Sequence, residues 1–402
     1  MNIGFVSTWL ERGATYVTRT YMDLLKQSNN LFVFARGGEF FDSTMSYEGA
    51  TIEKGLRLKN VEINWRQFEN WIKSNKLDII IFNEQDELDA VYKTRISFPN
   101  VLLVCYIDYY KENTLQSFDI YDVLLCNTKR HYEAFKWHNG ARYLPWGADL
   151  DVFKCPTDRV DKDKVVFFHS AGMSNRKGTL TLINAFVGNV LAEKGAKLIV
   201  HSQKKLETQY TDQELKKAGV EVITKTVHHP GLYYMGDVYV YPTTLDGLGL
   251  TIYEALASGL PVITTDAAPM NEIVNNENGR LVAVKRVCSR SDGYYWPLSY
   301  VDDRSLMDAM LYYIKNKESL GKLKQAARTY AEENLDIRSR CTQLMDILND
   351  ALTRKDSADA ERMLREYKKQ RNNVKFRELA ESALPDVIKS HIRERFENSR
   401  KQ

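Results

Sequence analysis

Short apolar runs alternate with longer amphipathic stretches along most of this chain. The runs are rich in Val, Ile, Phe and Tyr, which is typical of strands buried on both faces of a parallel sheet. Between them, residues such as Trp65, Phe68 and Ile72 recur at helical spacing and predict crossover helices. The pattern is therefore that of an α/β fold. In the first half we predict strands at 2–7, 31–35, 78–82, 101–107 and 123–126, and a helix at 16–27.

The alternation is interrupted once, around 143–157, where Pro145, Gly147 and Pro156 punctuate a stretch without periodicity. Beyond this break we predict strands at 165–169, 197–200, 220–223, 238–241 and 261–265, with helices at 179–193 and 250–257. The economical arrangement is two doubly wound, Rossmann-like domains with a helical C-terminal extension. We place the domains at 1–150 and 151–351 and a charged helical tail at 352–402.

Composition changes this picture only by exclusion. Hydrophobic residues make up 44% and charged residues 27% of the 402 residues, so a disordered or fibrous chain is excluded. A net charge of +3 names no partner, and no nucleic acid is expected. The five cysteines include no C-x-x-C pair and are predicted to be reduced. Without an 18-residue apolar run or a leader-like start, we expect a cytoplasmic protein.

Residues 238–266 run from a predicted strand through a glycine-rich loop into a predicted helix. Gly247 and Gly249 would let the backbone approach a ligand, and the first N–H groups of the helix would face a diphosphate. Asp246 and Glu254 bracket the loop and could accept hydrogen bonds from sugar or ribose hydroxyls. The alternative that the residues alone leave open is a tight turn with an acid at the helix start and a solvated Glu254.

A second strand-turn-helix segment, 167–180, places Arg176 and Lys177 at the predicted start of its helix. Cations there oppose the helix dipole, at a cost of about 0.3 to 1 kcal/mol. We infer that an anion binds at that end, with plainly solvated cations as the alternative.

The segment D-G-L-G-L-T-I-Y-E-A-L-A-S-G-L-P-V at 246–262 resembles the E-x7-E loop of the retaining glycosyltransferases of family four, the glycosyl transferases group 1. Asp246 and Glu254 hold the two acid positions of that motif. The resemblance covers residues 1 to about 351 and is better marked in the second domain. Its other elements are the interdomain link at 145–156, the basic clamp at 174–178, P-x-x-E-x-V at 269–274 and Gly279.

The resemblance implies a GT-B fold, in which two Rossmann-like domains face each other across a cleft. It implies a nucleotide-diphosphate sugar bound mainly by the second domain, an acceptor facing the first, and neither a metal nor another cofactor. Asp246 would touch the transferred sugar as a catalytic residue, and Glu254 would hold the ribose. The donor-binding residues would be Gly13, Arg176, Lys177, Gly247, Leu248, Gly249, Leu250, Thr251 and Glu254.

Asp108 ends a predicted strand of the first domain, where many family members carry a His. Ligands lie beyond the carboxyl ends of strands in doubly wound sheets, so Asp108 is our second predicted catalytic residue, contacting sugar or acceptor. A surface Asp capping a turn is the equal alternative. Acids of the loop that begins at Glu84 could approach the same cleft or be solvated.

Two metal-like patterns have plainer explanations. Asp149-Leu150-Asp151 is formally a D-x-D, but its place in the linker favours a turn, and His228-His229 lacks a third ligand at convincing spacing. We therefore expect no metal site.

The tail is the basic part of the chain, since residues 354–402 hold 14 Lys plus Arg against 9 Asp plus Glu. Its stripe could pack on the body, lie peripherally on an anionic membrane or pair with a second subunit; scarce aromatic residues favour packing. The stripe consists of Leu379, Leu384, Val387, Ile388, Ile392 and Phe396, interrupted by Pro385.

The sequence therefore predicts a retaining, metal-independent glycosyltransferase that moves a sugar from a nucleotide-diphosphate donor to an acceptor hydroxyl in polysaccharide or glycoconjugate synthesis. The acceptor would be a glycan or a lipid-linked molecule. The alternatives are a sugar-nucleotide epimerase on the same fold and a non-catalytic module that binds sugar or nucleic acid.

Overall fold

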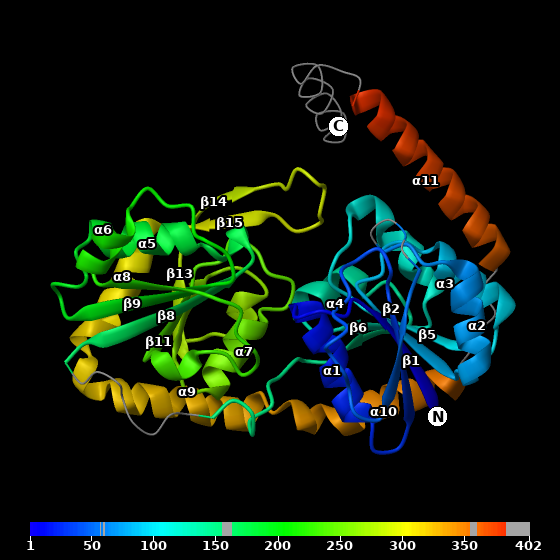
Figure 1. The fold of residues 1–402 in the computed structure, drawn as a ribbon, viewed down its shortest axis with the longest axis horizontal. Coiled ribbons are helices and arrows are strands. Elements are labelled where there is room, and N and C mark those ends of the chain that lie inside the picture. Colours follow the sequence, from blue (N-terminus) through cyan, green and yellow to red (C-terminus); the bar gives the residue numbers. More distant parts are fainter. Residues whose placement is uncertain (57, 59–60, 155–162, 354–359, 383–402) are drawn as a thin grey trace.

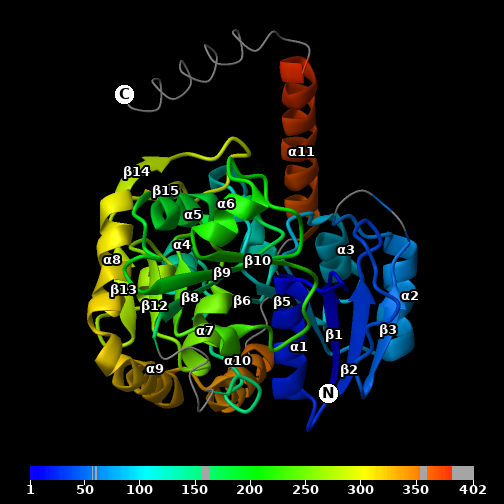
Figure 2. The same ribbon diagram turned by 60° about the vertical axis from the view of Figure 1, so that its left-hand side comes forward.

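The computed structural model describes residues 1–56, 58, 61–154, 163–353 and 360–382. Within them the chain forms two domains that lie side by side, each with a parallel sheet covered by helices on both faces (Figure 1). The view in Figure 2, turned by 60°, shows helix α1 of the first domain beside the second domain. The α/β architecture predicted from the alternation is confirmed.

The first domain is built on a seven-stranded sheet in the order β3-β2-β1-β4-β5-β6-β7. Its strands are β1 (Asn2–Ser7), β2 (Asn30–Ala35), β3 (Ala50–Lys54), β4 (Ile79–Asn83), β5 (Leu102–Tyr106), β6 (Val123–Cys126) and β7 (Ala141–Tyr143). Its helices are α1 (Gly13–Leu25), α2 (Trp65–Asn75), α3 (Asp89–Ser97) and α4 (Lys129–Phe135), with a 3₁₀ segment at Glu112–Ile120.

The second domain has a six-stranded sheet in the order β10-β9-β8-β11-β12-β13 and a separate hairpin. Its sheet strands are β8 (Val165–Gly172), β9 (Ala196–Ser202), β10 (Val220–Thr224), β11 (Val238–Tyr241), β12 (Val262–Thr265) and β13 (Gly279–Val282). The hairpin pairs β14 (Val284–Cys288) with β15 (Leu298–Val301). The helices are α5 (Thr179–Gly188), α6 (Asp212–Lys217), α7 (Leu250–Ala257), α8 (Asp303–Lys315) and α9 (Leu320–Asn334).

Buried strands were predicted best. The bounds predicted for β1, β6, β11 and α7 are those of the structure. The strands that we did not predict are half-exposed, as in β3 and β14, so they carry a weak apolar signal. The helix predicted at 179–193 is shorter and ends at Gly188, two residues before Val190 takes a left-handed φ of 47°.

The chain crosses between the domains twice, and the two crossings pair with each other. Ala148 donates its N–H to the carbonyl of Leu335 at 2.8 Å, and Ile337 donates to the carbonyl of Ala148 at 3.1 Å. A Cβ at Gly147 would lie 2.4 Å from the Leu335 carbonyl oxygen, so this approach requires glycine.

After the second crossing, α10 (Cys341–Thr353) lies against the first domain, and α11 (Ala360–Ser382) begins on that domain and then extends away from it (Figures 1 and 2). Leu344 and Leu348 of α10 are buried in a core that the two domains share, and the Cys341 thiol donates to the Leu24 carbonyl of α1 at 3.0 Å. Residues 341–351, which we had assigned to the second domain, therefore pack on the first.

Helix α11 packs on α3 through its first turns. The rings of Tyr367 and Tyr92 lie 5.2 Å apart, and Lys368 pairs with Asp89 at 3.7 Å. This part of the tail thus packs on the body, which is the interpretation we favoured. The residues that make the contact are not those of the predicted stripe. Of that stripe, residues 384–396 and the Leu379 side chain lie outside the description. None of the described helices is long and apolar enough to cross a membrane.

Candidate functional site

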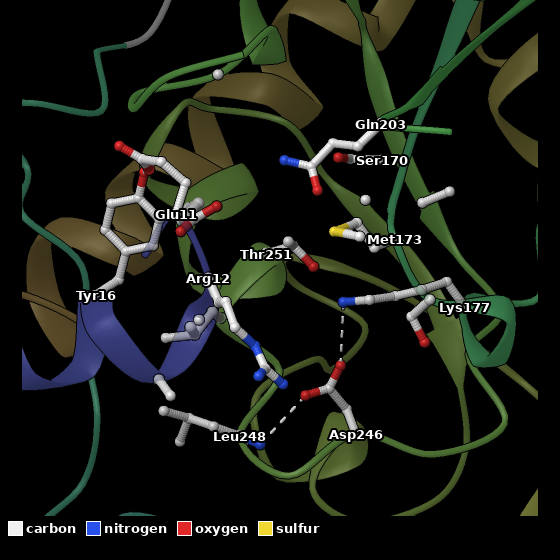
Figure 3. A pocket seen from close by; sticks show the side chains of 18 of the residues that line it. Glu11, Arg12, Tyr16, Ser170, Met173, Lys177, Gln203, Asp246, Leu248 and Thr251 are labelled. Carbon is white, nitrogen blue, oxygen red and sulfur yellow. Dashed lines mark hydrogen bonds and ion pairs between the residues drawn. The ribbon is translucent and has the colours of Figure 1, made fainter. Parts of the chain in front are cut away.

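A cavity of about 510 Å³ lies between the two domains, at the carboxyl ends of both sheets (Figure 3). Its volume is within the range of small-molecule sites. The loops that follow β1, β4 and β5 line it from one side, and those that follow β8 to β11 line it from the other. Of the predicted site residues it is lined by Gly13, Asp108, Arg176, Lys177, Asp246, Gly247, Leu248, Leu250, Thr251 and Glu254.

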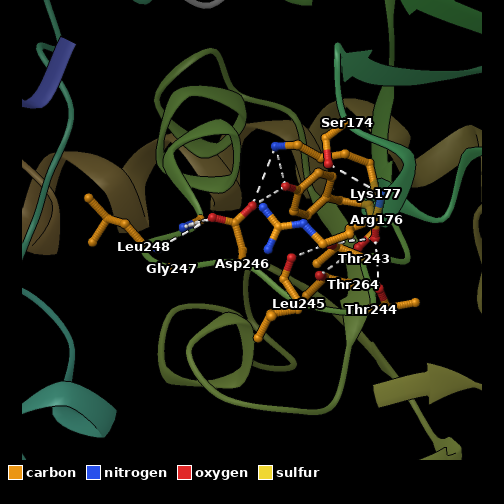
Figure 4. A network of polar contacts seen from close by, with 12 residues as sticks. Ser174, Arg176, Lys177, Thr243, Thr244, Leu245, Asp246, Gly247, Leu248 and Thr264 are labelled. Carbon is orange, nitrogen blue, oxygen red and sulfur yellow. Dashed lines mark hydrogen bonds and ion pairs between the residues drawn. The ribbon is translucent and has the colours of Figure 1, made fainter. Parts of the chain in front are cut away.

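Asp246 is the centre of a polar network at the bottom of this cavity (Figure 4). One carboxylate oxygen accepts the N–H groups of Gly249 at 2.9 Å and Leu248 at 3.3 Å. The other accepts the hydroxyl of Tyr241 and lies 3.4 Å from Nζ of Lys177. Asp246 therefore holds the glycine loop in shape, and its predicted contact with a sugar remains a prediction.

The ionisation of Asp246 follows from these partners. Burial alone would raise the pKa of its carboxyl, but the Lys177 charge and the Tyr241 hydrogen bond outweigh burial and lower the pKa to about 2. Asp246 is thus an anion that neutralises part of the cationic charge at the cavity floor.

We predicted Arg176 and Lys177 at the start of the helix, but the structure places both residues before α5. They belong to a 3₁₀ turn at Asn175–Lys177, and Gly178, with a left-handed φ of 73°, separates that turn from the helix. A Cβ at Gly178 would lie 2.0 Å from the Pro242 carbonyl oxygen, so this turn packs directly on the loop after β11. The two cations are placed by this packing and not by the helix dipole.

Helix α7 opens toward the cavity. Gly249 precedes it with a left-handed φ of 80°, and Leu250 and Thr251 form its first turn, where N–H groups have no partner within a helix. These N–H groups and the Lys177 ammonium approach the same space, which suits an anion. Gly249 itself is not part of the lining, so its contribution is the backbone conformation.

Glu254 lies one turn further along α7 and faces the same cavity. Its carboxylate accepts a hydrogen bond from the Tyr233 hydroxyl at 2.5 Å. Burial raises the pKa of Glu254, while Tyr233 and Lys177 oppose the rise. The solvated Glu254 of the alternative interpretation is therefore wrong.

Asp108 of the first domain meets the glycine loop of the second. A Cβ at Gly247 would lie 1.6 Å from Asp108 Oδ1, so any larger residue would displace this carboxylate from its observed position. We had expected Gly247 to make room for a ligand. In the structure it makes room for the opposite domain.

Asp108 is also close to a second acid of the first domain. Glu84 follows β4 as Asp108 follows β5, and the two strands pair Asn83 with Tyr106. Burial, and then the charge of Asp108, raise the pKa of Glu84 from 4.5 to about 8, against the opposing charges of Arg36 and Arg12 and with a smaller contribution from Glu39. At neutral pH this acid pair holds a proton.

We expect the pH dependence of stability to reveal that proton. Because the pKa of Glu84 is raised on folding, its stabilising contribution is complete below about pH 4.5 and is lost as the pH rises toward 8. The Tm of the wild type should therefore fall relative to Glu84→Gln between pH 5 and 8, by about 2–4 °C for each kcal/mol lost, and level off above pH 8. Glu48→Gln, at an exposed site, is the control. Parallel curves for wild type and Glu84→Gln would contradict the shared proton.

Comparisons with known proteins agree with this geometry. Residues 163–290 match the family model described as glycosyl transferases group 1. Over 182 residues the chain is 25% identical to the lipopolysaccharide core biosynthesis mannosyltransferase LpsB of Rhizobium meliloti, covering 40% of this chain and 51% of that protein. The chain spans about half the length of the curated relatives it matches.

Solved structures match over most of the chain. Anabaena Alr3699/HepE, in complex with UDP and glucose, superposes with a TM-score of 0.66 at 16% identity, over 87% of this chain and 99% of that one. WaaG, a glycosyltransferase involved in lipopolysaccharide biosynthesis, gives 0.63 at 15% identity, over 86% and 99%. The chain has the GT-B fold. The fold implied by the sequence resemblance is thus confirmed.

Of the two metal-like patterns, the histidine pair lines the cavity between the domains and the D-x-D pattern does not. Asp149 and Asp151 both pair with Arg338 beside the interdomain crossings, the former at 3.1 Å. His228 lies 3.4 Å from Glu11, and the ring of His229 stacks on Tyr16 at 5.3 Å. The histidine pair thus contacts the first domain across the cleft.

Sequence reasoning missed several residues of this GT-B cleft. Glu11, Arg12 and Tyr16 surround Gly13 at the start of α1, and the position of the predicted loop after β1 could have indicated them. Arg130 is only 5% exposed and reaches the glycine loop, but its position in the polar run K-R-H-Y-E predicts a charged side chain at the surface. No sequence signal distinguishes it.

Proposed function

We propose that this GT-B protein is a retaining glycosyltransferase that transfers a sugar from a nucleotide-diphosphate sugar to an acceptor hydroxyl. The observation that carries the proposal is the approach of Lys177, Arg176 and the first turn of α7 to one cavity between the domains. Matches to a lipopolysaccharide mannosyltransferase and to a structure holding UDP support polysaccharide or glycoconjugate synthesis as the setting. A cytoplasmic location and a glycan or lipid-linked acceptor belong to the same proposal.

In this proposal the chain's own charges stabilise the leaving diphosphate. Lys177, bonded to Tyr241 and Asp246, and the N–H groups of Leu250 and Thr251 are held in place before the reaction, so they stabilise developing charge without reorganising, and Arg176 adds a second positive charge at the same cavity. Glu254 accepts the ribose hydroxyls. Attack from the face that the diphosphate leaves requires no protein nucleophile.

The deciding experiment compares donors and then acceptors. UDP-, GDP- and ADP-sugars are screened by thermal shift, where a ligand at 100 times its Kd stabilises by about 2.7 kcal/mol. With the best donor, release of nucleotide should depend on an added acceptor, and NMR should show a retained anomeric configuration. Conversion of the donor without acceptor would identify an epimerase, and binding without turnover would identify a sugar-binding module.

We expect Glu254→Ala to weaken the binding of the nucleoside diphosphate selected by that screen by about 10- to 100-fold. The substitution removes a charged acceptor, whose hydrogen bonds contribute about 1.5–3 kcal/mol, and leaves the Tyr233 hydroxyl without its partner. Calorimetry measures the loss, and Tyr233→Phe shows how much of it comes from Tyr233. Equal affinities for wild type and Glu254→Ala would remove Glu254 from the donor site.

We also expect transfer to be indifferent to chelators. The proposed clamp is cationic, and the D-x-D carboxylates are occupied by Arg338. Initial rates with and without EDTA test this. If EDTA abolishes transfer and manganese restores it, the metal-independent mechanism is wrong.

A further inference from the structure

Arg130 of α4 extends from the first domain into the second. Its guanidinium donates to the carbonyls of Asp246 at 2.6 Å, Ala268 at 2.7 Å and Gly247 at 3.2 Å. Two of these carbonyls belong to the glycine loop beneath the cavity. A buried cation of one domain is thus bonded to backbone oxygens of the other.

The second domain holds α4 in return. The carboxylate of Glu272 accepts the backbone N–H groups of Lys129 at 2.6 Å and Arg130 at 2.9 Å, which caps the start of α4. The ring of Trp296, from the loop between β14 and β15, lies 5.1 Å from the Arg130 guanidinium. Arg130 is therefore fixed from several sides by the opposite domain.

The neighbouring His131 adds a hydrogen-bonded chain. A carbonyl can only accept, so Nε2 must carry the proton that bonds Gly247 at 3.1 Å. Nδ1 then accepts from the Tyr110 hydroxyl at 2.9 Å, and that oxygen accepts from Trp296 Nε1 at 2.5 Å. Burial and the Arg130 charge lower the pKa of His131, in agreement with a neutral ring.

The hairpin loop at 289–297 reaches the first domain at the same place. Figure 1 shows the arm of β14 and β15 extending toward that domain. Tyr294 donates its hydroxyl to the Asp108 carbonyl at 2.9 Å, and its ring stacks on Tyr109 at 5.1 Å. The hairpin loop, α4 and the glycine loop thus meet around Asp108, and their contacts exist only while the domains are together.

We propose that Arg130 is a positioning residue that orders the glycine loop when the cleft closes, so that closure and completion of the donor site are one event. The inference rests on the proposed function only for the identity of the ligand. When the domains separate, Asp246 and Gly247 lose their carbonyl partners in the first domain, and the loop that presents the start of α7 keeps only the contacts of the Asp246 carboxylate within its own domain.

Two measurements without any ligand test this proposal in the full chain. In Arg130→Lys we expect the amides of residues 247–252 to exchange hydrogen at least ten-fold faster, and the radius of gyration from X-ray scattering to increase. The matched control is Arg95→Lys. Arg95 is 6% exposed and pairs with Asp122 within the first domain, so its replacement should alter neither quantity.

The outcomes separate this inference from the proposed function. The proposal is overturned if hydrogen exchange in the glycine loop of Arg130→Lys is unchanged. It is also overturned if exchange becomes faster while the radius of gyration stays the same, because the order of the loop would then be independent of closure. Both results hold whether or not the protein transfers sugar. If Arg130→Lys does not fold, His131→Phe, which removes one bond to Gly247, should show the same two changes at smaller size.

Steady-state kinetics distinguish the proposed role of Arg130 from a purely structural one, because a purely structural role would leave the kinetic constants unchanged. With the donor selected by thermal shift, Arg130→Lys should raise the donor KM and lower kcat while the acceptor KM stays constant. A lower Tm with unchanged kinetic constants would show that Arg130 serves the domain interface alone.

Discussion

Lys177→Ala is expected to reduce transfer about 100-fold, which corresponds to about 2.7 kcal/mol of lost transition-state stabilisation. In the proposed mechanism its ammonium is one of the two cations that stabilise the leaving diphosphate. The structure also alters the expectation for stability. A cation that merely opposed a helix dipole would leave the fold unchanged or slightly more stable when removed.

Lys177 instead pairs with Asp246, and both side chains are only about one-fifth exposed, at 22% and 19%. Its removal leaves a buried carboxylate without its cation, so the apo protein should lose about 1.5–3 kcal/mol and melt several degrees lower. Initial rates at saturating donor and melting curves without ligand measure the two effects. Lys205→Ala, at an exposed position on the same domain, should change neither.

The Lys177 variants also distinguish charge from packing. Lys177→Met keeps the aliphatic chain and should lose as much activity as Lys177→Ala. Normal turnover in both variants would exclude Lys177 from the diphosphate site, even if both melt at lower temperature.

Gly247→Ala is expected to lower transfer by a similar factor, about 100-fold, for a different reason. The new Cβ would coincide with Asp108 Oδ1, so the carboxylate must turn away from the cavity or the domains must move apart. Gly247 has no left-handed φ, so the cost comes from this contact and not from backbone strain. Gly188→Ala is the control, because a Cβ there meets nothing within 4 Å.

A double-mutant cycle identifies the contact. In the Asp108→Ala background the additional Gly247→Ala substitution should change the Tm little, and the coupling between the two should be about 0.5–3 kcal/mol. Additive effects on Tm would show that the two residues do not meet, and that the closed cleft described above is not the arrangement in solution.

Much of the fold could be predicted because buried strands and their helices have strong local signals. β6 and β11 are continuous apolar runs, β1 is an apolar run between Asn2 and Ser7, and α7 follows a glycine at its start and ends before another, so their bounds follow from the residues themselves. The loop at 246–254 could also be singled out, because glycines and acids lie between a predicted strand and a predicted helix, although the residues alone left a plain tight turn open. These features are determined by residues that lie close together in the sequence.

The sequence by itself therefore determined two Rossmann-like domains and the loop that carries the candidate donor site. Only the tertiary structure decided that Lys177 pairs with Asp246, that Gly247 admits Asp108, and that α10 returns to the first domain. Only it decided that Arg130 reaches the glycine loop. The physical reason is range: periodicity and turn chemistry act between residues close in the chain, whereas these contacts join segments more than 65 residues apart, whose meeting depends on how the second sheet is assembled and on how the two domains pack.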